Sequence, residues 1–190
     1  MILPIYTYNH PVLKQKTARI EDMSDELAAL INNMFETMHE ANGIGLAANQ
    51  VGRGLALTVI DTSEALDEEL AGQANHKGSS EGRIVLINPV IESFGDEEEE
   101  FEEGCLSLPD LRDVVVRPTE IQIRYLDEHF NEQVRQASGL LARVMQHEID
   151  HLNGVYFFER LSPIRKTLAQ GKLKRIAKGD FEAEYEVYRD

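Results

Sequence analysis

The stretch GLLARVMQHEIDHLNG, residues 139–154, places His147 and His151 four positions apart, with Glu148 directly after the first. Side chains four positions apart lie on the same helix face, so these imidazoles can occupy two neighbouring positions of a tetrahedral metal. Glu148 lies beside them and is suited to accept a proton from a water on that metal. Gly154 is a suitable C-terminal stop. The pattern predicts a helix that carries a metal site and its own base.

The apolar positions of this helix indicate which way it faces. Leu140 and Val144 share a stripe with the two histidines, and Ser138 is a suitable N-cap before them. We therefore expect the histidines to point inward with the apolar face. Unpaired imidazoles would be costly there, which argues against a helix with surface histidines and a surface glutamate.

A third ligand is needed, because two histidines leave a catalytic metal short of one protein ligand. A zinc endopeptidase of the HExxHxxGxxH type would have histidine where this sequence has Phe157. Cys105, in the segment EEGCLSLP, is the best unused soft ligand, because a thiolate binds such a metal well. The preceding Gly104 permits unusual backbone geometry beside a metal. A buried structural cysteine and a nucleophilic cysteine are the alternatives.

The segment GIGLAANQVG, residues 43–52, follows a predicted helix and is rich in small residues. It contains a G-x-G pattern, but it follows no strand and lacks the Lys-Ser/Thr of a phosphate-binding loop. Its small residues suit close approach of the backbone to an extended ligand, and Gln50 offers an amide donor for an oxyanion. A tight turn without a function is the alternative.

The remaining periodicities predict an α+β protein. Residues 24–42 have the pattern of an amphipathic helix that Gly43 ends, and a second helix begins near Ser162 and runs to Gly179. Strand patterns occupy residues 55–61, 83–89 with an end at Pro89, 113–118, 120–127, a hairpin at 127–134 and an edge strand at 181–188. Helices and strands do not alternate as they do in a doubly wound fold.

Length and composition limit the class of protein. The 190 residues fit a single domain over 1–190, with a polar insertion at 63–82 and a basic helix with a short strand at 160–190. The net charge of -15 argues against general binding to DNA or to anionic membranes. We find no signal-peptide pattern and no membrane-spanning apolar run, and the single cysteine fits a reducing, cytoplasmic location.

Charge is unevenly spread along the chain. Residues 160–178 contain seven basic residues and no acidic one, whereas residues 96–103 read DEEEEFEE. A solvated face is the simplest interpretation of both segments. The basic segment could also dock to a phosphate-rich or acidic partner.

Three segments together resemble the peptide deformylase family. GIGLAANQ, EGCLS and QHEIDHLNG match that family's motifs GxGxAAxQ, EGCLS and QHExDHLxG, intact and in the same order. The resemblance covers residues 2–162 apart from the insertion. Asn49 stands where many members have proline, at a position that the motif leaves free.

The resemblance implies antiparallel β-sheets around a central helix that carries the HExxH motif. It implies that Cys105, His147 and His151 bind one divalent metal, usually Fe(II), with Zn, Ni or Co able to occupy the site. The implied activity removes the N-formyl group from the N-formylmethionine of newly synthesised polypeptides and releases formate. A metal-activated water would attack the formyl carbonyl, with Glu148 as general base and acid.

The resemblance also implies roles for the surrounding residues. Gln50 and the main-chain N–H of Leu106 would bind the oxyanion. The residues implied to hold the substrate backbone or border its methionine pocket are Ile44, Gly45, Glu103, Gly104, Leu140 and Val144. Segment 160–178 matches a region that contacts the ribosome in some bacterial members, so ribosome docking is an expectation. A zinc endopeptidase and a non-catalytic ribosome-associated homologue are the alternatives.

Overall fold

The structure, a computed structural model, describes residues 1–63 and 82–189. Its helices there are η1 (Pro11–Leu13), α1 (Asp25–Glu40), η2 (Ala48–Val51), α3 (Gly139–Leu152), η3 (Phe157–Arg160) and α4 (Pro163–Ile176), where η marks a short 3-10 helix. Its strands are β1 (Gly45–Ala47), β2 (Leu57–Ile60), β3 (Ile84–Phe94), β4 (Glu98–Cys105), β5 (Leu108–Pro118), β6 (Glu120–Leu126) and β7 (Glu132–Ser138).

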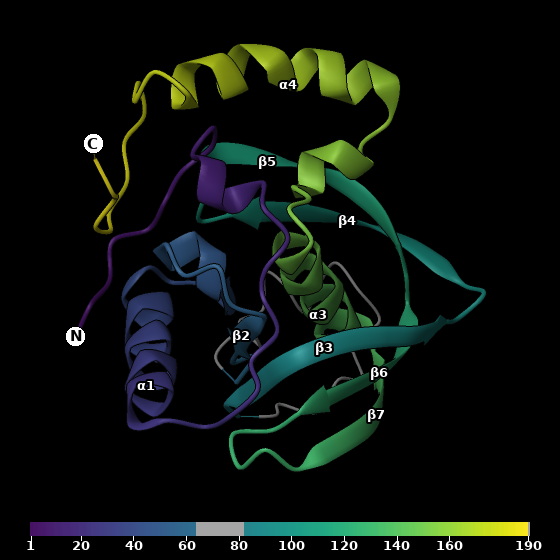
Figure 1. The fold of residues 1–190 in the computed structure, drawn as a ribbon. Coiled ribbons are helices and arrows are strands. Elements are labelled where there is room, and N and C mark those ends of the chain that lie inside the picture. Colours follow the sequence, from purple (N-terminus) through teal and green to yellow (C-terminus); the bar gives the residue numbers. More distant parts are fainter. Residues whose placement is uncertain (64–81, 190) are drawn as a thin grey trace.

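Two antiparallel sheets surround the helix α3 (Figure 1). Five strands form one sheet in the order β1-β2-β3-β6-β7, and β4 and β5 form a separate hairpin. The helix α3 packs against both sheets, while α1 covers β1 and β2 and α4 lies along β5. The expected α+β fold, with antiparallel sheets around the HExxH helix, is confirmed.

Helix α3 is buried on all sides. Every residue from Leu140 to Leu152 is buried, including six polar or charged ones. The helix begins after Ser138 as predicted, although the Ser138 side chain makes no capping hydrogen bond. It ends before Gly154, which has a φ of +72°, and a Cβ there would lie 2.5 Å from the carbonyl oxygen of Lys14. Only glycine fits this end of the helix without strain.

Proline at position 89 does not end its strand, contrary to the prediction. Strand β3 continues to Phe94, with a register shift between Ile87 and Val90. Asn88 adopts a φ of +52° at this shift, and its side chain bonds the main chain of Ile20. Proline is tolerated at such a bulge, because the ladder there requires no N–H from it.

The acidic segment 96–103 contains most of a strand that the sequence analysis missed. In β4 the side chains alternate, so that Phe101 and Glu103 are buried while Glu98, Glu100 and Glu102 are exposed. The prediction of a solvated face is therefore correct for one face only. Strand prediction depends on an alternation of apolar and polar residues. The strand was missed because Glu103, a charged residue, occupies a buried position where an apolar residue is expected.

The end of helix α1 and the C-terminal segment both differ from the prediction. Gly43 was expected to end α1, but the residue that adopts left-handed backbone geometry after this helix is Asn42, with a φ of +53°. Residues 181–188 form no edge strand; one bridge joins Ile5 to Val187. The second predicted helix is confirmed as α4, although it ends at Ile176.

The polar insertion at 63–82 lies, except for its two end residues, outside the described residues. Over the described ranges 1–63 and 82–189, no helix has the length and apolar character needed to cross a membrane.

Candidate active site

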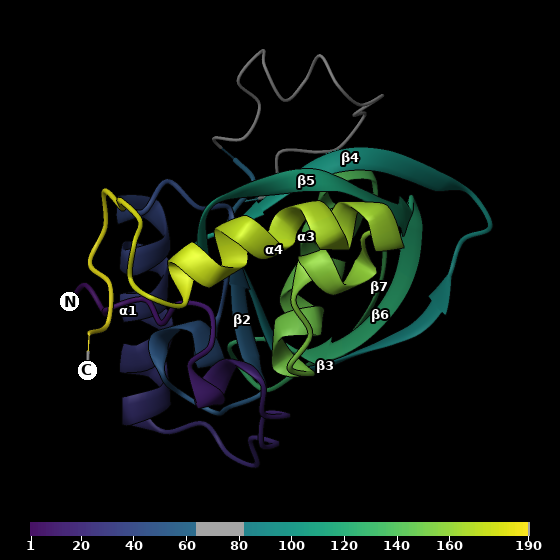
Figure 2. The same cartoon turned by 90° about the horizontal axis from the view of Figure 1, so that it is seen from above.

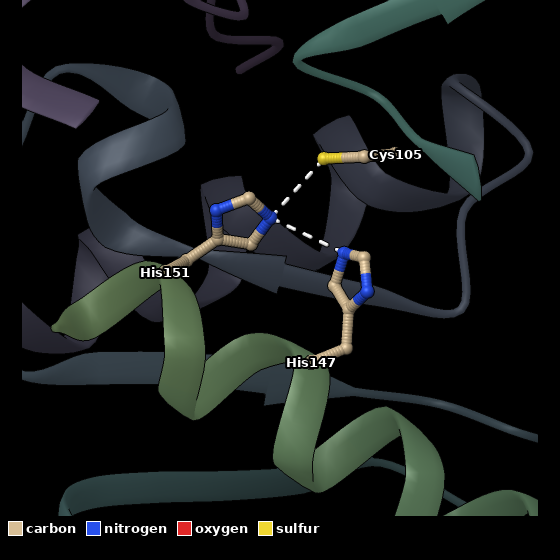
Figure 3. A group of neighbouring side chains, drawn as sticks. All are labelled: Cys105, His147 and His151. Atoms are coloured by element: carbon tan, nitrogen blue, oxygen red, sulfur yellow. Dashed lines mark hydrogen bonds between the residues drawn. The ribbon is translucent and has the colours of Figure 1, made fainter. Parts of the chain in front are cut away.

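Three side chains from two distant segments point toward one another (Figure 3). Nε2 of His151 lies 3.1 Å from Sγ of Cys105 and 3.2 Å from Nε2 of His147. The potential ligand atoms of all three residues lie within 4.8 Å of one another. The structure therefore brings together the three residues that the sequence analysis assigned to a metal.

The local structure explains this convergence. His147 and His151 are one turn apart on α3, and Cys105 is the last residue of β4. The β4–β5 ladder shifts register between Gly104 and Cys105. Gly104 itself does not adopt a positive φ. The irregular backbone geometry expected beside the candidate metal site is therefore the register shift between β4 and β5. A Cβ at Gly104 would lie 3.3 Å from Cγ of Arg112, which leaves little room for a larger residue.

The two imidazoles differ in protonation while no ion is bound. Burial alone would lower the pKa of His147, but hydrogen bonds with Cys105 and Glu103 raise it well above its usual value. A metal cation would take the place of the proton on Nε2 of His147, because only the deprotonated nitrogen is a ligand. Burial and the neighbouring His147 lower the pKa of His151, so its ring is neutral. A neutral imidazole offers a lone pair to a metal.

The donor set fits a divalent metal. A tetrahedral ion with bonds of about 2.0–2.3 Å places its ligands about 3.3–3.6 Å apart, close to the distances seen here. Nδ1 of His147 lies 2.9 Å from Oε2 of Glu103. A proton on Nδ1 donates to this carboxylate and leaves the Nε2 lone pair facing Cys105 and His151. One thiolate and two imidazoles are a suitable set for a transition metal.

Glu148 lies next to this cluster with one carboxyl oxygen unsatisfied. Its side chain is 4% exposed, and none of the described residues makes a hydrogen bond with Oε2. Burial raises the pKa of Glu148 to about 7. A Cβ added to Gly45 would lie 2.5 Å from Oε1, so glycine is required for the close contact of the loop with this carboxylate. A carboxyl group with this pKa can both accept and donate a proton near neutral pH.

The Gln50 amide and the turn at Leu106 lie next to Cys105. The Gln50 amide is oriented by the Ala47 N–H, which donates to Oε1 at 2.8 Å. Its Nε2 then lies 3.1 Å from Oγ of Ser107 and 3.5 Å from Sγ of Cys105. The β4–β5 ladder pairs Cys105 with Leu108, so the Leu106 N–H takes no part in it. Gln50 and Leu106 thus lie beside the candidate metal ligands, as the resemblance implied.

A buried ion-pair network supports the site, and the sequence analysis missed most of it. Arg117 bonds Glu103 at 2.6 Å and Asp150 at 2.8 Å, and Arg143 bonds Glu103 at 2.8 Å. Burial alone would raise the pKa of Glu103, but hydrogen bonds from His147 and Arg117 hold it well below its usual value. The available signal was limited to the two arginines, which stand in the otherwise apolar stretches VVVRP and LLARVM, because buried charges require partners.

A cavity of about 750 Å³ opens onto the cluster. All six residues expected to contact substrate line it, namely Ile44, Gly45, Glu103, Gly104, Leu140 and Val144. The carboxylate of Glu103 is nevertheless occupied by two arginines and His147. Glu103 can therefore contact a ligand in the cavity only through its main-chain atoms.

The position of the third endopeptidase ligand holds an apolar ring. Phe157 is 1% exposed and stacks on His147 with ring centroids 6.0 Å apart. This ring supplies no donor atom to a metal, which agrees with the role of Cys105 as the third candidate ligand.

The chain is similar to known proteins of one family over nearly its whole length. The family model described as Polypeptide deformylase matches residues 2–167. A peptide deformylase of Salinibacter ruber is 45% identical over 185 residues, which cover 97% of this chain and 93% of that one. One of Chlorobium limicola is 46% identical over 187 residues, covering 98% and 95% of the two chains.

Solved structures show the same similarity in three dimensions. The peptide deformylase of Thermus thermophilus superimposes with a TM-score of 0.81 at 38% identity, over 94% of this chain and 99% of that one. The enzyme of Legionella pneumophila gives a TM-score of 0.77 at 38% identity, over 94% and 96%.

Proposed function

The chain belongs to the polypeptide deformylase family of hydrolases, and we propose that it removes the N-formyl group from N-formylmethionine on newly synthesised polypeptides, releasing formate. The observation that carries the proposal is the position of one buried, unpaired carboxyl group, Glu148, directly beside a Cys-His-His cluster. A substrate of this kind fits a cytoplasmic enzyme that acts on nascent chains.

Cys105, His147 and His151 would hold the divalent cation, which we propose to be Fe(II), with Zn, Ni or Co able to replace it. When bound, such an ion supplies Lewis acidity to water and to a carbonyl oxygen. The spacing of the three donor atoms supports this assignment. The hydrogen bond between Nδ1 of His147 and Glu103 also supports it, because it leaves Nε2 of His147 available. Metal analysis after anaerobic purification tests the identity of the ion.

Glu148 moves the protons in the proposed reaction. Its carboxylate accepts a proton from the water whose oxygen attacks the formyl carbon. It then donates a proton to the methionine nitrogen as the C–N bond breaks, which gives formate and a free amine. The raised pKa of Glu148, about 7, supports both roles, because the group can gain and lose a proton near neutral pH.

Gln50 and Leu106 stabilise the negative charge that develops on the formyl oxygen. The donors would be Nε2 of Gln50, which lies 3.5 Å from Sγ of Cys105, and the main-chain N–H of Leu106, the residue that follows Cys105 in the turn. One such donor contributes about 3 kcal/mol to the transition state. Ser107 and Ala47 hold the Gln50 amide before substrate binds, so little reorganisation is needed.

The cavity wall provides the substrate contacts. Ile44, Leu140 and Val144 supply apolar surface for the methionine side chain. The main chain at Gly45 and Gly104 binds the substrate backbone. No side chain is needed at these glycines, and Glu148 and Arg112 leave little room for one.

A formate-release assay on formyl-Met-Ala peptides tests the proposed function. Glu148→Gln should lower kcat by at least about 100-fold while metal content stays stoichiometric, because the base is lost and the ligands remain. Cleavage of blocked, unformylated peptides would support the endopeptidase instead. A wild-type protein that holds stoichiometric metal and releases no formate would support the non-catalytic homologue.

For the basic segment 160–178, we propose docking to the ribosome. Part of its charge is neutralised, because Arg160, Arg165 and Arg175 pair with aspartates. Lys174 and Lys178 are exposed, and no carboxylate of the described residues lies within 4.0 Å of either. Two apolar residues on the same helix, Ile164 and Leu168, are each 75% exposed. The exposed lysines suit a partner surface rich in phosphate, and the two apolar side chains would add contact area with a protein component of such a partner.

A further inference from the structure

The two ends of the chain lie side by side next to the active site. Figures 1 and 2 both show the C-terminal segment running beside the N-terminal one. The Ile5 N–H donates to the Glu186 carbonyl at 2.8 Å, and the Tyr188 N–H donates to the Ile5 carbonyl at 2.9 Å. The rings of Tyr6 and Tyr188 stack with centroids 4.1 Å apart. These contacts fix the main chain on the C-terminal side of Tyr185.

Tyr185 reaches from this segment to the turn that carries a proposed oxyanion donor. Its hydroxyl donates to the carbonyl oxygen of Leu106 at 2.6 Å. The side chain is partly buried and lines the cavity. Burial raises the pKa of Tyr185, so the hydroxyl keeps its proton over the working range of an enzyme.

The turn itself is held from three directions. It consists of Leu106 and Ser107, because Cys105 pairs with Leu108 across it. Besides the Tyr185 bond, the Ser107 carbonyl accepts from the Tyr8 N–H at 2.9 Å, and Oγ of Ser107 accepts from Gln50 at 3.1 Å. Of these three contacts, only the one from Tyr185 acts on Leu106.

The N-terminal segment also contacts the other proposed donor. The Tyr6 N–H donates to the carbonyl oxygen of Gln50 at 2.8 Å. The residue before it, Ile5, makes the two main-chain bonds to the C-terminal segment. A closed set of hydrogen bonds therefore links Gln50, the Leu106–Ser107 turn and both ends of the chain.

We propose that Tyr185 is a positioning residue for the reaction: its hydroxyl fixes the Leu106–Ser107 turn so that the Leu106 N–H stays directed at the developing oxyanion. This inference rests on the proposed function. The family model ends at residue 167, so the match to the family does not itself assign a role to Tyr185. A donor that is held before the reaction begins contributes more to the transition state than one that must be ordered during it.

Tyr185→Phe in the metal-loaded full chain tests the inference, because it removes one hydroxyl and keeps the ring. We expect kcat on formyl-Met-Ala peptides to fall about three- to tenfold, the range of one lost hydrogen bond. KM and metal content should stay within error, since substrate contacts and ligands are unchanged, while the melting temperature should fall by no more than about 2–4 °C, as one lost hydrogen bond allows. Glu186→Gln is the matched control. Its exposed side chain neighbours Tyr185, its main-chain bond remains, and its kcat should equal that of the wild type.

Hydrogen–deuterium exchange supplies a readout that does not depend on turnover. Exchange in a peptide that contains Leu106 should rise in Tyr185→Phe and remain unchanged in Glu186→Gln, while peptides from α3 exchange as in the wild type. An unchanged kcat and unchanged exchange at Leu106 would overturn the inference, as would a loss confined to KM. A wild-type protein without formate release overturns the proposed function instead, and the exchange experiment then still decides whether Tyr185 holds the turn.

Discussion

Oε2 of Glu103 lies 2.9 Å from Nδ1 of His147, although the two residues belong to β4 and α3. The same carboxylate accepts hydrogen bonds from Arg117 and Arg143, so it stays ionised inside the protein. An ionised acceptor at Nδ1 fixes the tautomer of the imidazole and makes Nε2 a better ligand. The strand that supplies Cys105 therefore also orients one of the two histidines.

Glu103→Gln should weaken metal binding without removing a ligand. An amide keeps the shape of the side chain but loses the charge that orients His147, so we expect the metal dissociation constant to rise about 10- to 100-fold. Competition with a chelator measures this change. Glu100→Gln is the control, because that side chain is on the same strand and exposed. Equal affinity of Glu103→Gln and the wild type would contradict the orienting role.

The stability of the metal-free protein should fall in acid because of Glu103. The pKa of Glu103 is lower in the folded protein than its ordinary value of 4.5, so the unfolded chain takes up the proton first. The stabilising contribution is therefore complete above that value and is lost as the pH falls below it. Urea unfolding of chelator-treated protein between about pH 7 and pH 3 measures this loss. Glu103→Gln should show a flatter dependence, and parallel curves for the two proteins would refute the explanation.

Gly45→Ala should impair catalysis while leaving the metal in place. The added Cβ would lie 2.5 Å from Oε1 of Glu148, and displacement of a catalytic group by about 1 Å can cost up to about 100-fold. We expect kcat to fall about 10- to 100-fold, measured by formate release, with metal content unchanged. Gly54→Ala is the control, because a Cβ there meets nothing within 4 Å. Full activity of Gly45→Ala would show that Glu148 does not depend on this contact.

The double variant Lys174→Gln/Lys178→Gln should weaken co-sedimentation with ribosomes at low salt. Each lysine that contacts a phosphate contributes to a salt-dependent affinity, so the difference from the wild type should shrink as salt increases. Lys16→Gln/Arg53→Gln removes the same charge from exposed residues outside α4 and should sediment as the wild type does. Equal loss in both variants would indicate a general charge effect, and no loss in either would leave segment 160–178 a solvated face.

Local patterns were sufficient for the main helices and for the two histidines of the candidate metal site. The spacing of His147 and His151 on a helix follows from its 3.6-residue period, and Gly154 marks its end. The strand β4 was missed and β3 was ended too early. In both cases the deciding factor is a contact with a distant segment. A bulge in the pairing of β3 with β6 accommodates Pro89, and arginines from β5 and α3 make a buried glutamate tolerable.

The sequence by itself determined which chemical groups the protein has and on which helix two of them lie, because helical spacing is a local property. Only the tertiary structure decided that Cys105 reaches them, that Glu103 orients His147 and that Tyr185 meets Leu106. These pairs are separated by 44 to 79 residues, so their distances depend on how the sheets close around α3. The environment of Glu148 is likewise tertiary, because the surrounding elements bury its carboxyl group and thereby raise its pKa.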